Sequence, residues 1–261
     1  MTNDSLKSLT FRNGIKVDVG AKPATKLLIS PRVGFNWDVM SNKKTQVRGG
    51  FGFFAGPPPF VWISNQAGNN GVQFGSFSNG NGTTANLPFS PNPDAFRPGP
   101  GLLSKSHNIA VTDKNFRYPQ NFKASLGIDQ KLPKNWTITI EGTYNKDVNA
   151  VYFQNINLPY TGATFAGADP RVWYSSPQIY AGTGGASLTN PNISDVILMK
   201  NSNKGYGYFL TLQLQKTARN FSGSVAYTYS KSRTINDGGS IAQSNWRDRP
   251  VAGDPNTDDL G

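Results

Sequence analysis

The chain has 261 residues and a formal net charge of +11, but its Lys and Arg residues are scattered along the sequence. No basic helix or zinc-finger spacing accompanies this charge, so nucleic acid is excluded as an expected partner. The absence of Cys excludes disulfides and thiol chemistry. No apolar run approaches the roughly 20 residues of a transmembrane helix, although barrel strands would give only a weak hydropathy signal.

The first predicted hairpin lies near the N-terminus. Over residues 33–39 every second residue is apolar and the residues between them are polar or Gly, and we call these two sets the apolar frame and the polar frame. A turn-like stretch follows at 40–44, and the alternation resumes over 47–53. Two further pairs repeat the pattern, with strands at 122–129 and 136–144 and then at 206–215 and 221–230. Period-two alternation is the signal of a β-strand. We therefore predict six strands in three hairpins.

The two frames also differ in charge. The apolar frames carry no charge within the strands, which suits a lipid-facing surface, because Lys or Arg in mid-membrane costs about 2–4 kcal/mol. Aromatic residues lie near the strand ends, where they are predicted to meet the membrane interface. These are Trp37 and Trp136 beside the short turns, and Tyr144, Tyr206, Tyr208, Tyr227 and Tyr229 toward the long loops. The side chains predicted to face the lumen are Arg48, Lys123, Asp129, Glu141 and Gln213.

Long connections join the hairpins at residues 55–117 and about 149–204, and a third begins near Ser232. Short turns at one end and long loops at the other are typical of an outer-membrane β-barrel. The prediction is an all-β, antiparallel up-and-down transmembrane barrel segment with short periplasmic turns and long extracellular loops. Since bacterial barrels begin at about eight strands, we expect residues 1–261 to form an internal part of one larger barrel domain. A soluble β-sandwich with an aromatic inner face is the alternative.

Aromatic and Asn/Asp-rich loops could bind sugars or peptides. The candidates for ligand binding are Trp62, Tyr160, Trp173, Tyr174, Trp246 and Arg247. The alternative is that these aromatic residues only pack the loops on one another. Lys and Arg at the rims would suit the phosphates of lipopolysaccharide.

No catalytic constellation is recognisable. His107 stands alone, and no glycine-rich phosphate loop follows a strand, so we predict no enzyme activity, metal site or cofactor. The stretches Asp237–Gly239 and Asp254–Asp259 resemble loose calcium loops. They lack EF-hand spacing, and ordinary turns use the same residue types.

Several short segments stand in a fixed order along the chain. The first are Ser-Pro-Arg-Val-Gly-Phe-Asn-Trp-Asp at 30–38 and Gln-Val-Arg-Gly-Gly-Phe-Gly-Phe-Phe at 46–54. Others follow at residues 60–66, 118–120, 127–133, 144–152, 203–206, 212–217, 235–240 and 246–251. As an ordered set they resemble the barrel of TonB-dependent receptors of the Oar-like group, which is common in Bacteroidota.

The resemblance implies a barrel of about 22 strands whose lumen holds a plug. It also implies a TonB complex that couples import to the inner-membrane proton gradient. We expect the plug, the N-terminal domain and the closing strands to lie outside this chain. The chain would then be a barrel fragment of a receptor in the bacterial outer membrane, with lipid, lipopolysaccharide and an unknown solute as partners. The alternative function is a secreted adhesin or carbohydrate-binding β-domain.

Overall fold

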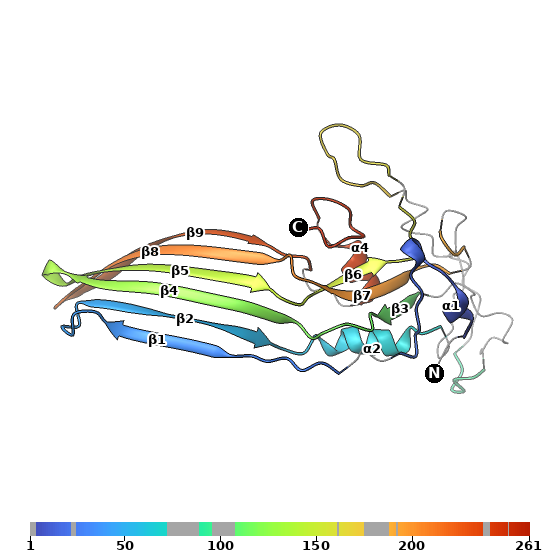
Figure 1. Ribbon diagram of the computed structural model, residues 1–261, viewed down its shortest axis with the longest axis horizontal. Coiled ribbons are helices and arrows are strands. Elements are labelled where there is room, and N and C mark those ends of the chain that lie inside the picture. Colours follow the sequence, from blue (N-terminus) through green and yellow to red (C-terminus); the bar gives the residue numbers. More distant parts are fainter. Residues whose placement is uncertain are drawn as a thin grey trace.

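The computed structural model describes residues 4–21, 25–71, 89–95, 108–160, 162–174, 188–191, 193–236, 241–249 and 251–261. A long, narrow antiparallel sheet occupies one half of the molecule, and a smaller folded layer lies at one of its ends (Figure 1). No helix in these residues is long and apolar enough to cross a membrane.

The long sheet has six strands in the order β1-β2-β4-β5-β8-β9, with antiparallel pairing throughout. Each predicted hairpin is present, so the predicted fold class is confirmed for this sheet. The strands are β1 (Arg32–Asp38), β2 (Thr45–Ala55), β4 (Gln120–Leu132), β5 (Trp136–Asp147), β8 (Tyr206–Ala218) and β9 (Phe221–Arg233).

The short turns bring each hairpin back within a few residues. Ser41 and Lys43 in the first turn, and Lys134 and Asn135 in the second, have positive φ angles between 54° and 62°. Non-glycine residues adopt this left-handed conformation mainly in tight turns. The second turn includes the 3-10 helix η3 (Pro133–Asn135). These turns fix the register, so that the apolar residues of one strand lie beside the apolar residues of the next.

Three further strands lie in the long connections, where sequence reasoning predicted only loops. They are β3 (Ile109–Thr112), β6 (Ala150–Asn155) and β7 (Val196–Ser202), and they form a second sheet in the order β3-β7-β6. In this sheet β6 and β7 are antiparallel, whereas β3 and β7 are parallel.

The second sheet is an extension of the first. The β6 strand follows β5 after residues 148 and 149, and β7 precedes β8 by residues 203–205. At the junction the Asp147 amide donates a hydrogen bond to the Gly205 carbonyl at 2.9 Å. The pairing of β5 with β8 therefore passes into the pairing of β6 with β7 (Figure 1).

The hydrophobic core lies in this second layer rather than in the long sheet. On one face of the sheet, α2 (Phe60–Gly68) and α4 (Ala242–Arg247) pack against Phe153, Ile197 and Met199. On the other face, the N-terminal segment with α1 (Asp4–Ser8) and the 3-10 helix η1 (Arg12–Gly14) covers Val196 and Leu198. Both faces are thus buried, which makes the layer a packed unit.

Candidate functional site

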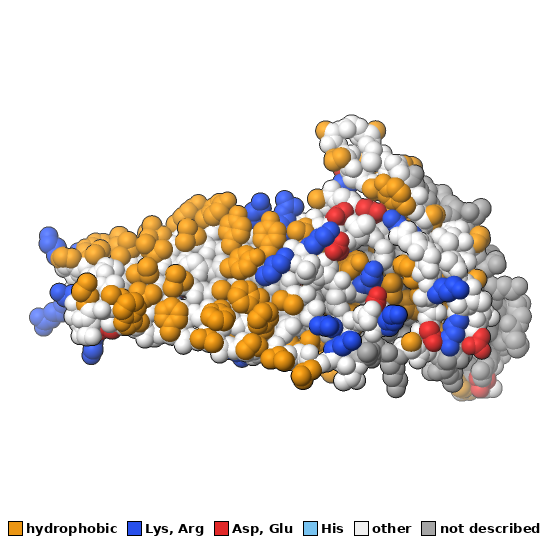
Figure 2. Space-filling view, in the orientation of Figure 1, with side chains coloured by type: hydrophobic (Ala, Val, Ile, Leu, Met, Phe, Trp, Pro, Cys, Tyr) orange, Lys and Arg blue, Asp and Glu red, His pale blue; other side chains and the backbone are white. Residues whose placement is uncertain are grey.

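The apolar frame of the six-stranded sheet forms one continuous exposed surface (Figure 2). Aligned register places residues of the same frame side by side on successive strands, as in the row Trp37, Val47, Ile128, Ile140, Leu212 and Tyr227. Leu210 is 54% exposed and Val225 is 74% exposed. Soluble monomers rarely expose a contiguous apolar surface of more than a few hundred Å².

The predicted interface aromatics have two distinct locations. Trp136 lies at the short-turn end of the sheet, where Lys216 Nζ is 4.9 Å from the centre of its ring. Toward the layer, the rings of Tyr208 and Tyr229 are 6.3 Å apart, and Tyr144 pairs with Tyr208 across the strands. Trp37 lies at the short-turn end of β1, and Tyr206 begins β8 at the layer end.

Tyr227 is the exception among these aromatics. It lies midway along β9, opposite Leu212, and not toward the long-loop end as the sequence analysis placed it. The reason is that β8 and β9 continue in register for several residues beyond the row shared with Trp37, so their turn projects further than that of β1 and β2.

An ion-pair network crosses three strands on the polar face. Arg48 of β2 donates from Nε to Asp129 Oδ2 of β4 at 3.0 Å and from Nη2 to Glu141 Oε2 of β5 at 2.7 Å. Thr139 Oγ1 donates to the other oxygen of Asp129 at 2.6 Å. These predicted lumen residues are thus brought together, and Gln213 lies in the neighbouring row opposite Thr139.

The absence of a side chain at Gly127 allows the Arg48 side chain to extend across β4. It stands between Arg48 and Glu141 in the register, and a Cβ at this position would lie only 3.2 Å from Arg48 Cζ. The guanidinium crosses β4 at the place where no side chain stands. Lys123 is separate from this network, because it lies toward the layer, with Nζ 5.7 Å from the centre of the Phe54 ring.

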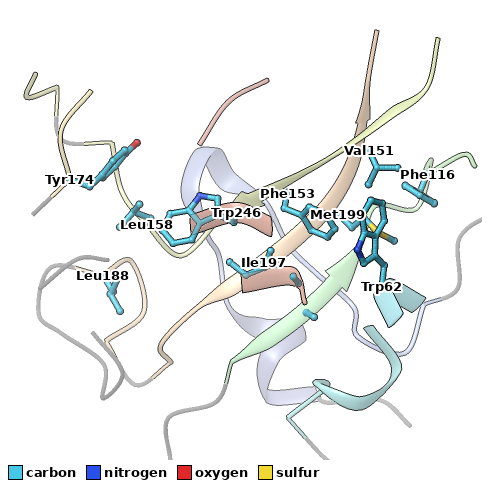
Figure 3. Packing of buried hydrophobic residues seen from close by; sticks show 12 residues of the cluster. Trp62, Phe116, Val151, Phe153, Leu158, Tyr174, Leu188, Ile197, Met199 and Trp246 are labelled. Carbon is cyan, nitrogen blue, oxygen red and sulfur yellow. The ribbon is translucent and has the colours of Figure 1, made fainter. Parts of the chain in front are cut away.

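Three of the six candidate ligand residues are buried in the layer. Trp62 is 7% exposed, Tyr174 is 4% exposed and Trp246 is 2% exposed, and all belong to one core cluster (Figure 3). Trp62 meets Phe153 edge-on with ring centres 5.4 Å apart. The structure therefore gives these three side chains the packing role that the sequence analysis kept as the alternative.

The other three candidates lie at the surface. Tyr160 is 58% exposed, with the Arg12 guanidinium 5.4 Å from the centre of its ring, and Trp173 is 45% exposed. Arg247 forms an ion pair with Asp248, Nε to Oδ1, at 3.0 Å. Tyr160 and Trp173 are the candidates whose rings can still meet a ligand.

Buried polar groups join the C-terminal segment to the layer. The Asn256 side chain, which is fully buried, donates to the Asn155 carbonyl at 2.7 Å and accepts from the Asn155 amide at 2.6 Å. It also accepts from Trp246 Nε1 at 3.1 Å. Asn256 thereby supplies hydrogen-bond partners for the Asn155 backbone on the side of β6 that faces away from β7.

A second polar cluster joins the N-terminal segment to the same region. Tyr174 Oη accepts from Arg12 Nη1 at 3.1 Å and donates to Asp254 Oδ1 at 3.0 Å. Burial raises the pKa of Tyr174 to about 12, although the Arg12 guanidinium opposes the rise. Burial also raises the pKa of Asp195, whose carboxylate accepts from Asn155 and Gln243.

The Asp-rich C-terminal stretch uses its carboxylates internally. Asp254 accepts from Tyr174, Asp258 accepts from Ser202 and pairs with Lys204, and Asp259 accepts from the Asp254 amide. Within the described ranges no group of three or more His, Asp or Glu residues could hold a metal ion. The other calcium-like stretch, at 237–239, lies outside the described residues.

Sequence reasoning missed the residues that build the layer. The apolar runs Ile-Ala-Val at 109–111 and Val-Ile-Leu-Met at 196–199 are the signals that could have found two of its strands. A short continuous apolar run is consistent with a strand buried on both faces. The buried roles of Asn155 and Asn256 have no comparable local signal, because the two residues are far apart in the chain.

Two solved structures are similar to this chain. The outer membrane transporter YddB from Escherichia coli aligns with a TM-score of 0.40 at 11% identity, over 76% of this chain and 19% of that one. The siderophore receptor PirA from Pseudomonas aeruginosa aligns with a TM-score of 0.38 at 13% identity, over 78% of this chain and 28% of that one. The chain thus spans less than a third of either structure, and no curated protein matches it.

Residues 11–259 match the family described as outer membrane beta barrel domain. This match covers almost the whole chain and agrees with the antiparallel sheet, its exposed apolar face and its opposite polar face. The chain therefore belongs to the outer-membrane β-barrel domain family, and its location is the bacterial outer membrane.

Proposed function

We propose that this chain supplies barrel wall and an extracellular capture layer to a receptor that takes up a solute in a TonB-coupled manner. In this proposal the apolar face meets lipid and lipopolysaccharide acyl chains, and the polar face lines the lumen. The Arg48 network would then contact a plug or the passing solute. The aromatics near the two ends of the sheet would lie at the membrane interfaces.

The observation that carries the proposal is the packed layer at the long-loop end. Long connections are uncommon in compact domains unless they are functional or disordered. Here they fold into a sheet with both faces buried, built on two strands that continue from the barrel wall. A rigid surface binds a ligand with little loss of conformational freedom. Tyr160 and Trp173 present exposed rings on this surface.

The TonB-coupled part of the proposal draws on the sequence resemblance to TonB-dependent receptors. It also draws on the open edges of the six-stranded sheet, since β1 and β9 each have one neighbour in the described part of the chain. Unpaired backbone groups are not tolerated in lipid, so the proposal includes further strands that close the barrel. A larger barrel of this kind leaves room for a plug.

Solute depletion from the growth medium tests the proposal. Mass spectrometry would compare the wild-type strain with strains that lack either the receptor gene or TonB. We expect one class of solute to remain in the medium of both deletion strains. A Tyr160→Ala, Trp173→Ala double variant should lower its depletion, whereas Phe89→Ala, at a residue that is 94% exposed, serves as the control. Depletion that depends on neither gene would contradict the proposal.

The alternative of a secreted adhesin or carbohydrate-binding domain receives no support from a specific observation. A secreted domain would have to keep the whole apolar face of the sheet in water. The family match also places the chain in the outer membrane.

A further inference from the structure

A cavity of about 730 Å³ lies in the layer close to the ends of β1 and β4. Its walls come from α2, from β3, from residues 116–118 before β4 and from residues 18–21 and 25–28 before β1. This volume lies within the range of about 300–1,000 Å³ that is usual for small-molecule sites. Figure 3 shows Phe116 and Met199, two of its lining residues, beside Trp62.

Most of the cavity wall is apolar. Ala110 and Val111 both line it, although neighbouring residues of a strand point to opposite faces of a sheet. The cavity therefore wraps around the edge of β3 that faces away from β7, which is the one strand paired with β3 in the described part of the chain. Ile63 of α2 adds to the same wall. An apolar ligand body fits these surroundings.

One polar group inside the wall has an unused hydrogen. Gln66 Oε1 accepts a hydrogen bond from Thr112 Oγ1 at 3.2 Å. Gln66 Nε2, in contrast, is buried and has no hydrogen-bond partner in the described residues. A buried donor without an acceptor is unfavourable, so a ligand oxygen at this position would be stabilised.

The charges around the cavity favour an anion. Lys26 and Arg117 line it, are exposed, and form no ion pair within the residues that the structure describes. The acid among the lining residues is Asp18, which is already paired with Lys7 at 3.0 Å and accepts from the Gly20 amide. The unneutralised charge at the cavity is therefore positive.

We propose that this cavity binds a free amphiphilic carboxylate. Its apolar body would lie against Val111, Phe116 and Met199, and its oxygens would accept from Gln66 Nε2 and meet the field of Lys26 and Arg117. This inference rests on the proposed function in one respect, which is that the bound carboxylate would be the class of solute taken up by the capture layer. Binding itself requires neither TonB nor a proton gradient.

Isothermal titration calorimetry of the full-length protein in phosphatidylcholine nanodiscs tests the proposal. Empty nanodiscs serve as the control for partition of the probes into the lipid. The probes are decanoate and the neutral decan-1-ol. We expect saturable binding of one decanoate per chain, roughly tenfold tighter than that of decan-1-ol because of the charge and the hydrogen bond. Absence of saturable decanoate binding, or equal affinity for the two probes, would overturn the proposal.

Variants of α2 locate the site. Ala67 lines the cavity from an exposed position, so Ala67→Trp should narrow the cavity and weaken decanoate binding, whereas Ser64→Trp, on the same helix outside the lining, should not. Gln66→Glu keeps an acceptor for Thr112 but replaces the free donor with an anionic oxygen. It should weaken decanoate by at least roughly tenfold and leave decan-1-ol within about twofold. Heat-modifiable migration in gels checks that each variant is folded.

Equal binding by the Ala67→Trp and Ser64→Trp variants would place the decanoate elsewhere and overturn the assignment. Loss of solute uptake together with intact decanoate binding would count against the proposed function alone. Intact TonB-dependent uptake without decanoate binding would count against this inference alone.

Discussion

Arginine substitutions at two adjacent residues of β8 distinguish its two faces. Leu212 and Gln213 lie at the centre of the strand, with Leu212 in the apolar row beside Ile140 and Tyr227 and Gln213 in the polar row beside Thr139. Leu212 is 49% exposed, and its cross-strand neighbours Ile140 and Tyr227 are also exposed. Arginine at this depth on a lipid-facing surface should cost about 2–4 kcal/mol, a shift of roughly thirtyfold to a thousandfold in the folding equilibrium.

Urea unfolding of the full-length protein in lipid vesicles, followed by heat-modifiable gel migration, measures this difference. Leu212→Arg should lower the free energy of unfolding by the stated amount or block assembly. Gln213→Arg should change it by less than about 1 kcal/mol, because an arginine on the polar face can reach water or a carboxylate. Equal effects of the two substitutions would refute the assignment of the faces.

Three further predictions concern the polar face and the layer. Gly127→Leu should displace the Arg48 guanidinium and, through overpacking, lower the free energy of unfolding by about 1–3 kcal/mol. Urea unfolding measures this, and a loss smaller than that caused by Gly127→Ala would contradict the prediction. Phe153→Ala removes a side chain that is 1% exposed, so the layer should lose about 3–5 kcal/mol, seen as faster hydrogen exchange in β6 and β7 but not in β4. Burial raises the pKa of Asp258, but the hydrogen bonds from Lys204 and Ser202 and the charge of Lys204 outweigh it and lower the pKa below its usual 3.8. The stabilisation by Lys204 should therefore be present at pH 5 and lost as the pH falls below 3.8 through that lower pKa. Hydrogen exchange of residues 251–261 should show this acid step, and its persistence in Lys204→Met would contradict the cause.

The six strands of the long sheet could be predicted because their two faces meet different surroundings. Alternation arises where one face is apolar and the other polar, as over residues 122–129 and 206–215. In β7 both faces are buried, so Val196–Met199 is a continuous apolar run without alternation. The strands of the layer were therefore missed for a physical reason.

The roles of the loop aromatics could not be predicted from their neighbours in the chain. Trp246 is buried because α4 packs on β6 and because its indole N–H meets Asn256, whose side chain in turn binds the backbone of Asn155. Tyr160 is also an aromatic residue in a long connection, but it remains exposed. The difference depends on contacts between distant segments, which local composition does not encode.

The short junctions from β5 to β6 and from β7 to β8 have a mechanical consequence. A cap that hangs on flexible tethers can swing aside, but this layer is held by a two-stranded β-ribbon that is an extension of the wall. Opening by rotation would have to bend that ribbon or break its junction at Asp147 and Gly205. We therefore expect the layer to move together with β5 and β8 rather than to swing aside from them.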